Sequence, residues 1–189
     1  MIIFSLDGTL ADCEHRRHFV DRDKAAEMDI CYEEVEYNFG GVQNGPWVLT
    51  KDPERLWKPD WHSFYDACDK DLPIEPVIDV LSEYLICDRD IVIWSGRCES
   101  VREKTEAWIQ RYIFKFLYEG DCSDVILKMR PIGDNTPDDQ LKEHWYDLHN
   151  VEHPNQNIEM VFDSDPDSIA MWRRRGIFVF DCNQTGKEF

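Results

Sequence analysis

The chain has 189 residues, a length that suits one domain with a small insertion. Its 39 acidic and 21 basic residues give a net charge of −18, which argues against extended binding to duplex nucleic acid, because such binding relies on Lys and Arg to neutralise phosphates. The seven cysteines contain no Cys-x-x-Cys pair and follow no secretory signal, and no apolar run reaches membrane-spanning length, so we expect reduced thiols and a cytoplasmic protein.

Short apolar runs alternate with helical patterns along the chain. The expected strands are Met1–Phe4, Ile91–Trp94, Val125–Met129, Ile158–Phe162 and Ile177–Phe180. Apolar residues recur at helical spacing in Pro76–Leu85, Ser100–Phe116 and Ser168–Arg175, and a further helix is expected to begin near Asp138. This alternation predicts an α/β fold with a Rossmann-like parallel sheet, helices on both faces and ligands at the carboxyl ends of the strands.

Residues 13–73 interrupt this rhythm with several Gly and Pro residues and no clear strand pattern. We predict a core domain of residues 1–12 and 74–189, and a loop-rich, partly helical cap of residues 13–73. The cap aromatics could stack a nucleic-acid base, but a small core of their own is the favoured interpretation for Trp57, Trp61, Phe64 and Tyr65. His15–His18, which follows the first strand and its turn, could face a phosphate cleft, but a solvated helix face is the favoured interpretation.

Polar groups that could hold phosphate follow the first two strands. Ser5-Leu-Asp7-Gly8-Thr9 ends the first strand, and Gly8 permits a sharp turn that would expose backbone N–H groups. Ser95-Gly96-Arg97 follows the second strand, where a hydroxyl and backbone N–H groups can hold phosphate oxygens. This second tripeptide is short, and an ordinary serine N-cap is an alternative explanation for it.

Two further segments carry charge that suits phosphate chemistry. Lys142 lies near the start of a predicted helix, where a solvated lysine paired with nearby acids is the alternative. Asp163-Ser164-Asp165-Pro-Asp167 follows an apolar strand, and oxygen ligands at a strand end are typical of a magnesium site. An acidic turn is the alternative there, in a chain so rich in acids.

Taken in order, these segments resemble the haloacid dehalogenase (HAD) phosphohydrolases, whose first motif reads Asp-x-Asp-Gly-Thr after a hydrophobic strand. Arg130–Glu143 and Met171–Gly176 are similar to the phosphatase domain of bacteriophage polynucleotide kinase/phosphatase and to related stand-alone phage phosphatases. Such a protein would work in the host cytoplasm. The Gly-x-x-x-x-Gly-Lys-Ser/Thr loop of the kinase half does not occur in this sequence.

The resemblance implies a Mg²⁺-dependent phosphomonoesterase that acts on nucleotides or nucleic-acid 3′-phosphate ends through an aspartyl-phosphate. The implied catalytic positions are Ser5 for the nucleophile, Asp7 for the general acid and base, and Ser95 and Lys142 for the phosphoryl oxygens. The implied metal ligands are Ser5, Asp7 through its carbonyl, Asp163 and Asp167. The implied substrate contacts are Thr9, which would also help to place Asp7, Gly96, Arg97 and Arg130.

Two serines depart from the family pattern. Ser5 stands where the family has its nucleophilic aspartate, and a hydroxyl without a base is a poor nucleophile and a weak metal ligand. Ser164 stands where the phage relatives usually have a second aspartate, for which Asp165 and Asp167 are candidate replacements. We therefore expect impaired turnover, and either an engineered serine or a naturally inactive relative would explain it.

Three functions follow from these patterns. The first is an impaired nucleotide or polynucleotide phosphatase, and the second is a catalytically inactive HAD-fold protein that binds a nucleotide or a partner. The third is a sugar-phosphate phosphatase. The acidic balance favours mononucleotides or short single-stranded ends as ligands. Nothing in the sequence indicates an oligomeric state.

Overall fold

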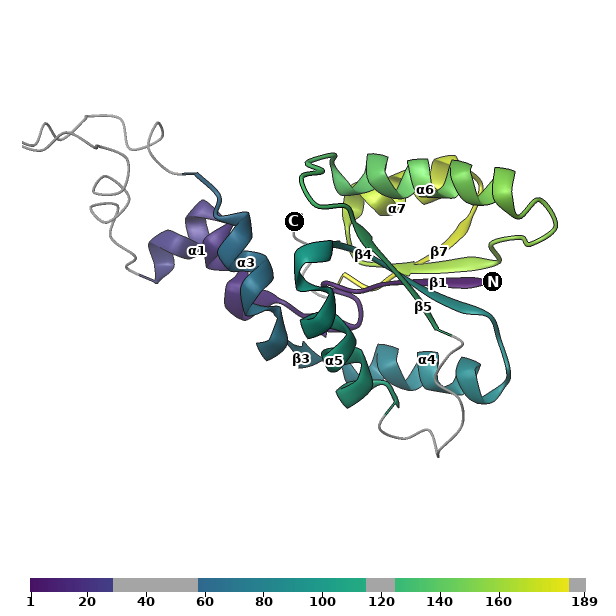
Figure 1. The fold of residues 1–189 in the computed structure, drawn as a ribbon, viewed down its shortest axis with the longest axis horizontal. Coiled ribbons are helices and arrows are strands. Elements are labelled where there is room, and N and C mark those ends of the chain that lie inside the picture. Colours follow the sequence, from purple (N-terminus) through teal and green to yellow (C-terminus); the bar gives the residue numbers. More distant parts are fainter. Residues whose placement is uncertain (29–57, 115–124, 184–189) are drawn as a thin grey trace, which may run out of the picture. The chain divides into compact units, whose positions relative to one another are not determined.

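A five-stranded parallel sheet forms the centre of the larger part of the protein in a computed structural model, which describes residues 1–28, 58–114 and 125–183. The strand order is β5-β4-β1-β6-β7, and every pairing is parallel. The strands are β1 (Ile2–Ser5), β4 (Ile91–Cys98), β5 (Ile126–Arg130), β6 (Met160–Asp163) and β7 (Phe178–Asp181) (Figure 1). All five strands predicted from the sequence are confirmed, as is the α/β class.

Helices cover both faces of this sheet (Figure 1). Helices α4 (Glu75–Ile86) and α5 (Arg102–Tyr112) lie on one face, and α6 (Asp138–Glu152) and α7 (Pro166–Arg174) lie on the other. The predicted helices are thus confirmed, although the far end of Ser100–Phe116 lies outside the described residues. None of the helices in the described ranges combines the length and apolar character needed to cross a membrane.

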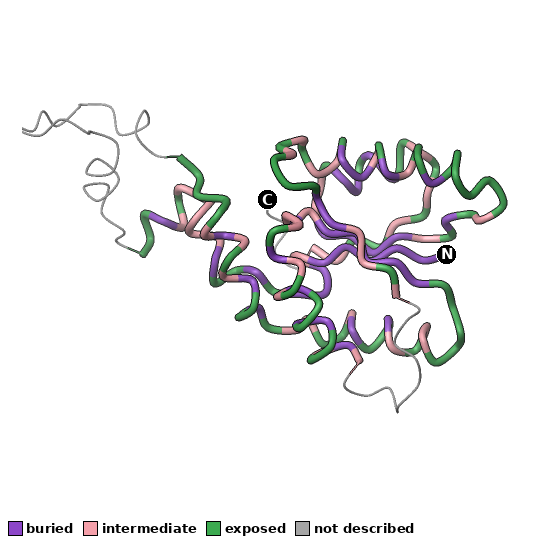
Figure 2. Tube along the Cα trace, in the orientation of Figure 1, coloured by how far each residue is buried: buried purple, intermediate pink, exposed green. Residues whose placement is uncertain are grey.

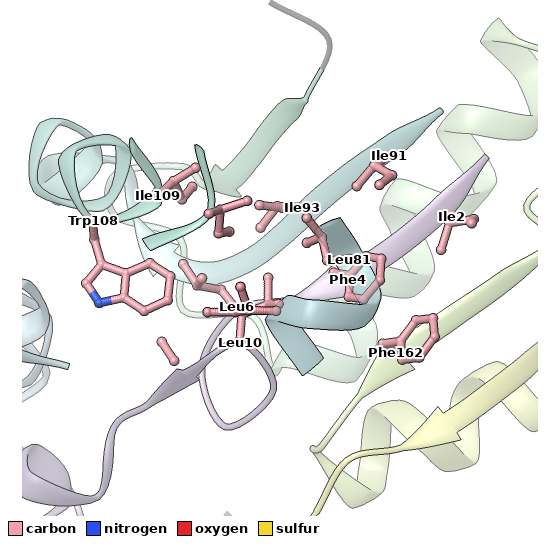
Figure 3. Packing of buried hydrophobic residues seen from close by; sticks show 13 residues of the cluster. Ile2, Phe4, Leu6, Leu10, Leu81, Ile91, Ile93, Trp108, Ile109 and Phe162 are labelled. Atoms are coloured by element: carbon pink, nitrogen blue, oxygen red, sulfur yellow. The ribbon is translucent and has the colours of Figure 1, made fainter. Parts of the chain in front are cut away.

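Alternating side chains of β1 supply the two halves of the core. Ile2 and Phe4 pack with α4 and α5, whereas Ile3 packs with α6 and α7. Figure 3 shows Phe4 beside Phe162 of β6, whose ring centroid lies 4.4 Å away in a stacked arrangement. The central strands are buried along their length, as Figure 2 shows, so a continuous apolar run rather than a strict alternation marks them in the sequence.

Replacing Phe4 by Leu is expected to lower the free energy of unfolding by about 1–2 kcal/mol, because the smaller side chain loses the stacked ring contact and leaves a void. Phe178 provides a matched control, since 65 % of it is exposed on the edge strand β7. Phe178→Leu should change the stability by less than about 0.5 kcal/mol. Urea unfolding followed by tryptophan fluorescence would measure both, and equal effects would contradict this account of the core.

A two-stranded antiparallel ribbon lies where the chain leaves this core and where it returns. Strand β2 (Ala11–Asp12) pairs with β3 (Leu72–Pro73). No strand was predicted here, and that expectation was wrong. A two-residue strand that contains a proline has no periodicity by which it could be detected in the sequence. The described chain divides into two compact units, which are Met1–Glu14 with Cys68–Phe189 and, between them, His15–Ala67. That the insertion acts as a cap stays a prediction.

The insertion contains short helices in its described residues. These are a 3₁₀ helix (Glu14–Phe19), α1 (Arg22–Glu27), and α3 (Trp61–Asp66), which is followed by a 3₁₀ turn (Ala67–Lys70). Asp21 and Asp60 cap α1 and α3 by accepting hydrogen bonds from backbone N–H groups. Trp57, one of the aromatics in the predicted small core, lies outside the described residues.

Arg16 was expected to lie on a solvated helix face, and the structure shows that this expectation was wrong. Its guanidinium is fully buried over the ring of Phe64, 4.1 Å from the centroid, and donates a hydrogen bond of 3.1 Å to the Phe64 carbonyl. Trp61 meets the same ring edge-on. Phe64 itself is buried, which agrees with the interpretation that this aromatic belongs to a small core within the insertion, whereas Trp61 is exposed and does not fit that interpretation.

Candidate active site

Three side chains from separate elements meet at the carboxyl end of the sheet. Ser5 ends β1, Asp163 ends β6, and Lys142 lies in the second turn of α6. The Lys142 ammonium lies 2.8 and 3.1 Å from the two carboxylate oxygens of Asp163 and 3.3 Å from the Ser5 hydroxyl. It also lies 3.2 Å from the Ser168 hydroxyl on α7. All four side chains are buried, so the lysine is part of an internal network, which excludes the solvated alternative.

The charge of Lys142 is set by its acidic neighbours. Burial by itself would lower its pKa, but the negative charges of Asp163 and Asp138 outweigh that effect and raise the pKa above the usual value for lysine. The side chain is therefore a cation at neutral pH. Because Asp163 lies against it, the two form a buried ion pair that joins α6 to the end of β6.

Hydrogen-bond donors surround the Asp163 carboxylate. Besides the lysine, it accepts hydrogen bonds from the backbone N–H groups of Ser164 and Asp165 at 2.9 and 3.3 Å, and from the Trp172 indole at 3.1 Å. The indole comes from α7, whose start is fixed by Asp165 as N-cap and by Pro166 at its first position. Asp163 is thus fully engaged within the protein.

Asp7 is held by a buried arginine that also contacts a second acid. The Arg97 guanidinium donates to the Asp7 carboxylate at 2.8 and 2.5 Å, and to the Asp71 carboxylate at 2.6 Å. Arg97 and Asp71 are fully buried, whereas 22 % of the Asp7 side chain is exposed. Arg97 therefore joins the turn after β1 to the start of β3, and it also donates a hydrogen bond of 3.4 Å to the Thr105 hydroxyl on α5.

Sequence reasoning missed Asp71. It is one acid in an acid-rich stretch, and no spacing or motif connects it to Arg97, 26 residues later. Its backbone carbonyl also accepts a hydrogen bond of 2.8 Å from the Trp108 indole on α5. Only the pairing of a buried acid with a buried arginine in the folded chain indicates that Asp71 holds Arg97 in position.

An Asp71→Asn variant is expected to lose about 2 kcal/mol in the free energy of unfolding, because a charge-assisted hydrogen bond to the buried Arg97 is replaced by a neutral one. The neighbouring Asp69 is exposed and offers the same chemical change as a control. Asp69→Asn should leave the urea midpoint almost unchanged. If the two variants unfold at the same urea concentration, Asp71 does not have this role.

The loop after β4 is built around a close approach between Gly96 and α6. The Ser95 hydroxyl accepts a hydrogen bond of 3.2 Å from the Arg97 backbone N–H. A Cβ atom at position 96 would overlap the Asp138 carboxylate, so glycine is needed there. Arg130, which is nearly buried, donates to the Gly96 carbonyl at 2.8 Å and also binds the Asp138 carboxylate. Its observed contacts hold this loop; direct contact with a substrate stays a prediction.

The turn after β1 uses its backbone N–H groups internally. Gly8 has φ = +74°, which confirms the predicted sharp turn, but its N–H donates to the Ala11 carbonyl and the Thr9 N–H donates to the Leu6 carbonyl. The expectation that these groups are exposed for phosphate was wrong, because the turn itself satisfies them. The buried Thr9 hydroxyl has no hydrogen-bond partner among the described residues, and so does not fix Asp7 in this structure.

The two further acids considered for the metal site, Asp165 and Asp167, lie at the start of α7. Asp165 caps α7 by accepting from the Ser168 N–H at 2.9 Å, and Asp167 is exposed in the first turn of that helix. The Ser164 hydroxyl donates instead to the Asp7 carbonyl, at 3.2 Å. In the part of the chain that the structure describes, three or more His, Cys, Asp or Glu side chains are nowhere grouped so that they could hold a metal ion.

The family model for the polynucleotide kinase PNKP phosphatase domain, a HAD domain, matches residues 60–186. A search of curated proteins finds no match. Among solved structures, the "Structure of the Pnkp1/Rnl/Hen1 RNA repair complex" matches with a TM-score of 0.57 and 21 % identity over 96 % of this chain and 41 % of that one. A second Pnkp1/Rnl/Hen1 structure matches with a TM-score of 0.56 and 22 % identity over 95 % and 44 % of the two chains.

Other HAD proteins share the fold. A haloacid dehalogenase-like hydrolase from Streptococcus pneumoniae matches with a TM-score of 0.50 and 15 % identity over 95 % of this chain and 82 % of that one. The present chain spans less than half the length of the two Pnkp1 complex chains that it matches. The structural matches establish the HAD fold, and the family model covers more than half of the sequence. The chain therefore belongs to the HAD phosphatase family of the polynucleotide kinase PNKP phosphatase domain.

Proposed function

We propose that this chain binds the phosphate monoester of a nucleotide or of a nucleic-acid 3′ end, and that it hydrolyses the ester slowly. The observation that supports this most is the buried contact between the Lys142 ammonium and the Ser5 hydroxyl at the end of β1. The ammonium can bind the negatively charged phosphate, whereas a serine hydroxyl without a base attacks phosphorus poorly. Family membership supports the class of ligand.

Hydroxyl groups at two neighbouring strand ends could receive the phosphate. Ser5 accepts a hydrogen bond from Lys142, and Ser95 accepts one from the Arg97 N–H, so the proton of each hydroxyl remains available to a phosphate oxygen. β1 and β4 pair in parallel, with Ser5 opposite Trp94, which places the two serines at the same edge of the sheet.

The same contacts explain why turnover should be slow. A serine attacks phosphorus well only when a base takes its proton. The hydroxyl of Ser5 contacts an ammonium group, which cannot accept a proton while it is charged, and Asp163 is engaged with that ammonium. The Asp7 carboxylate is bound to Arg97, and we propose that it serves the leaving oxygen instead. We propose that Arg97 positions Asp7 and that Arg130 positions the loop after β4.

Magnesium is the cofactor that the resemblance implies, and the residues present do not fit it. Mg²⁺ requires near-octahedral oxygen ligands, usually with one or two carboxylates that face the ion. Of the implied ligands, Ser5 is neutral, Asp163 is engaged by Lys142 and three further donors, and Asp167 is exposed on α7. We therefore assign no step of the proposed function to a metal ion.

A binding experiment tests the proposal. A short single-stranded oligonucleotide with a 3′-phosphate is expected to bind at least about 10-fold more tightly than the same oligonucleotide with a 3′-hydroxyl, measured by isothermal titration calorimetry. A 5′-phosphorylated oligonucleotide and a hexose phosphate, used as competitors, define the selectivity. Equal affinity for the phosphorylated and unphosphorylated oligonucleotides would contradict the proposal.

A catalytically silent binding protein is the second candidate, and the pairing of Ser5 with a protonated lysine favours it. Phosphate release from the 3′-phosphorylated oligonucleotide separates the two functions. Slow release that is lost in a Ser95→Ala variant would assign residual catalysis to this site. Binding without measurable release would identify the silent protein.

A further inference from the structure

We infer that the phosphate pocket of this chain works without a divalent cation, and that the Lys142 ammonium supplies the positive charge there. The inference rests on the proposed function for the nature of the ligand. The contacts of Ser5, Asp163 and Ser164 are the reason for inferring that no metal ion is required. It therefore distinguishes this pocket from one that is assembled around magnesium.

The lysine contacts oxygen atoms that a cation would need as ligands. Its Nζ atom lies within hydrogen-bond distance of both Asp163 oxygens, of Ser5 and of Ser168. These contacts use the oxygen atoms at the ends of β1 and β6 that could ligate a metal. A divalent ion at Asp163 would have to displace the ammonium or lie beside it, and both arrangements are electrostatically unfavourable in a buried site.

The backbone carbonyl of Asp7 is engaged as well. It accepts a hydrogen bond of 3.2 Å from the hydroxyl of Ser164, which is itself buried. A cation bound to this carbonyl would have a neutral hydroxyl as its neighbour in place of a carboxylate. The donor set around Asp7 thus contains no uncompensated carboxylate for Mg²⁺ to neutralise.

The two serines lower the negative charge near Asp163. Lys142 and Asp163 form an ion pair, and Ser5 and Ser164 contribute no charge, while the carboxylates of Asp138 and Asp165 also act on the lysine. Aspartate at both serine positions would add two negative charges, which is the amount that one divalent cation cancels. With two serines, the pocket has two fewer negative charges than it would have with two aspartates, and it can hold a phosphate through hydroxyl donors. The buried Thr9 hydroxyl, which has no partner among the described residues, is a further donor in the turn after β1.

The first test measures binding of inorganic phosphate and of thymidine 3′-monophosphate by calorimetry, once in EDTA and once with about 10 mM MgCl₂. The affinities should agree within about 2-fold between the two conditions. Tightening by about 10-fold or more in magnesium would overturn the inference. If neither compound nor the 3′-phosphorylated oligonucleotide binds in either condition, the proposed function fails, and the second test still decides the inference about the metal.

The second test needs no phosphate ligand. MgCl₂ alone should leave the melting temperature of the wild-type chain unchanged, and should raise that of a Ser5→Asp, Ser164→Asp double variant by several degrees relative to EDTA. A Ser82→Asp, Ser100→Asp variant adds the same charge at sites outside the network and should show no such response. Stabilisation of the wild type by magnesium would overturn the inference. Should the double variant not fold, calorimetric titration of the wild type with MgCl₂ decides it.

Discussion

A Ser5→Asp variant is expected to release phosphate from a 3′-phosphorylated oligonucleotide at least about 10³-fold faster than the wild-type chain in magnesium-containing buffer. The new carboxylate would end β1 beside the Lys142 ammonium, which lies 3.3 Å from the present hydroxyl. A carboxylate needs no base to take a proton before it attacks phosphorus, whereas the serine has only a cation beside it. Initial rates of inorganic phosphate release would measure the gain.

Ser5→Ala is the matched control for this prediction. If the hydroxyl binds the phosphate but is not a working nucleophile, its removal should weaken substrate binding and leave the residual rate at saturating substrate unchanged within about 2-fold. A large loss of rate in Ser5→Ala would show that Ser5 itself attacks, and would contradict the proposed function. The Ser5→Asp, Ser164→Asp double variant should be faster than Ser5→Asp and should lose its activity in EDTA, because it adds the carboxylate beside the Asp7 carbonyl.

Lys142→Met should lower the free energy of unfolding by about 3–5 kcal/mol, because it leaves the buried Asp163 without its cation. Lys70 is exposed, so Lys70→Met should change the stability by less than about 0.5 kcal/mol. A Lys142→Met, Asp163→Asn double variant should recover part of the loss, because no unpaired charge then remains. A double variant less stable than Lys142→Met would contradict the ion-pair interpretation. Urea unfolding at pH 7 would measure all of these variants.

The pH dependence of this stability difference follows from the raised pKa of Lys142. A cation whose pKa is higher in the folded than in the unfolded state contributes its full stabilisation below the unfolded value, which is near 10.5 for lysine. The contribution is lost as the pH rises through the folded pKa. The difference between wild type and Lys142→Met should therefore stay constant from about pH 7 to 9 and shrink above about pH 10.5. A difference that disappears below pH 9 would contradict this assignment.

The fold could be predicted because its signals are local in the sequence. Each buried strand is a continuous apolar run, as in Ile91–Trp94, and α4 and α7 show apolar residues at helical spacing. The β2–β3 ribbon could not be predicted, because two-residue strands carry no period. The burial of Arg16 against Phe64 could not be predicted either, because a contact between residues 48 positions apart leaves no local pattern in the sequence.

The meeting of Ser5 and Asp163 could also be expected from the sequence, because the carboxyl ends of parallel strands share one edge of the sheet. Lys142 was a weaker candidate, since a lysine in a helix is usually solvated. Its contact with both residues depends on how α6 packs over β1 and β6 through Leu141 and Trp145. Packing of this kind is decided by side chains from several elements together.

By itself, the sequence determined the parallel α/β architecture and the positions of the polar residues at the strand ends. Both depend on apolar runs and on the turns that follow them, which are formed by residues adjacent in the chain. Only the tertiary structure decided which charges are already paired. Arg97 binds Asp7 and Asp71, Lys142 binds Asp163, and Ser164 binds the Asp7 carbonyl. Hydrogen bonds and ion pairs act over a few ångströms between residues far apart in the chain, so whether a candidate ligand is still available is a property of the folded molecule.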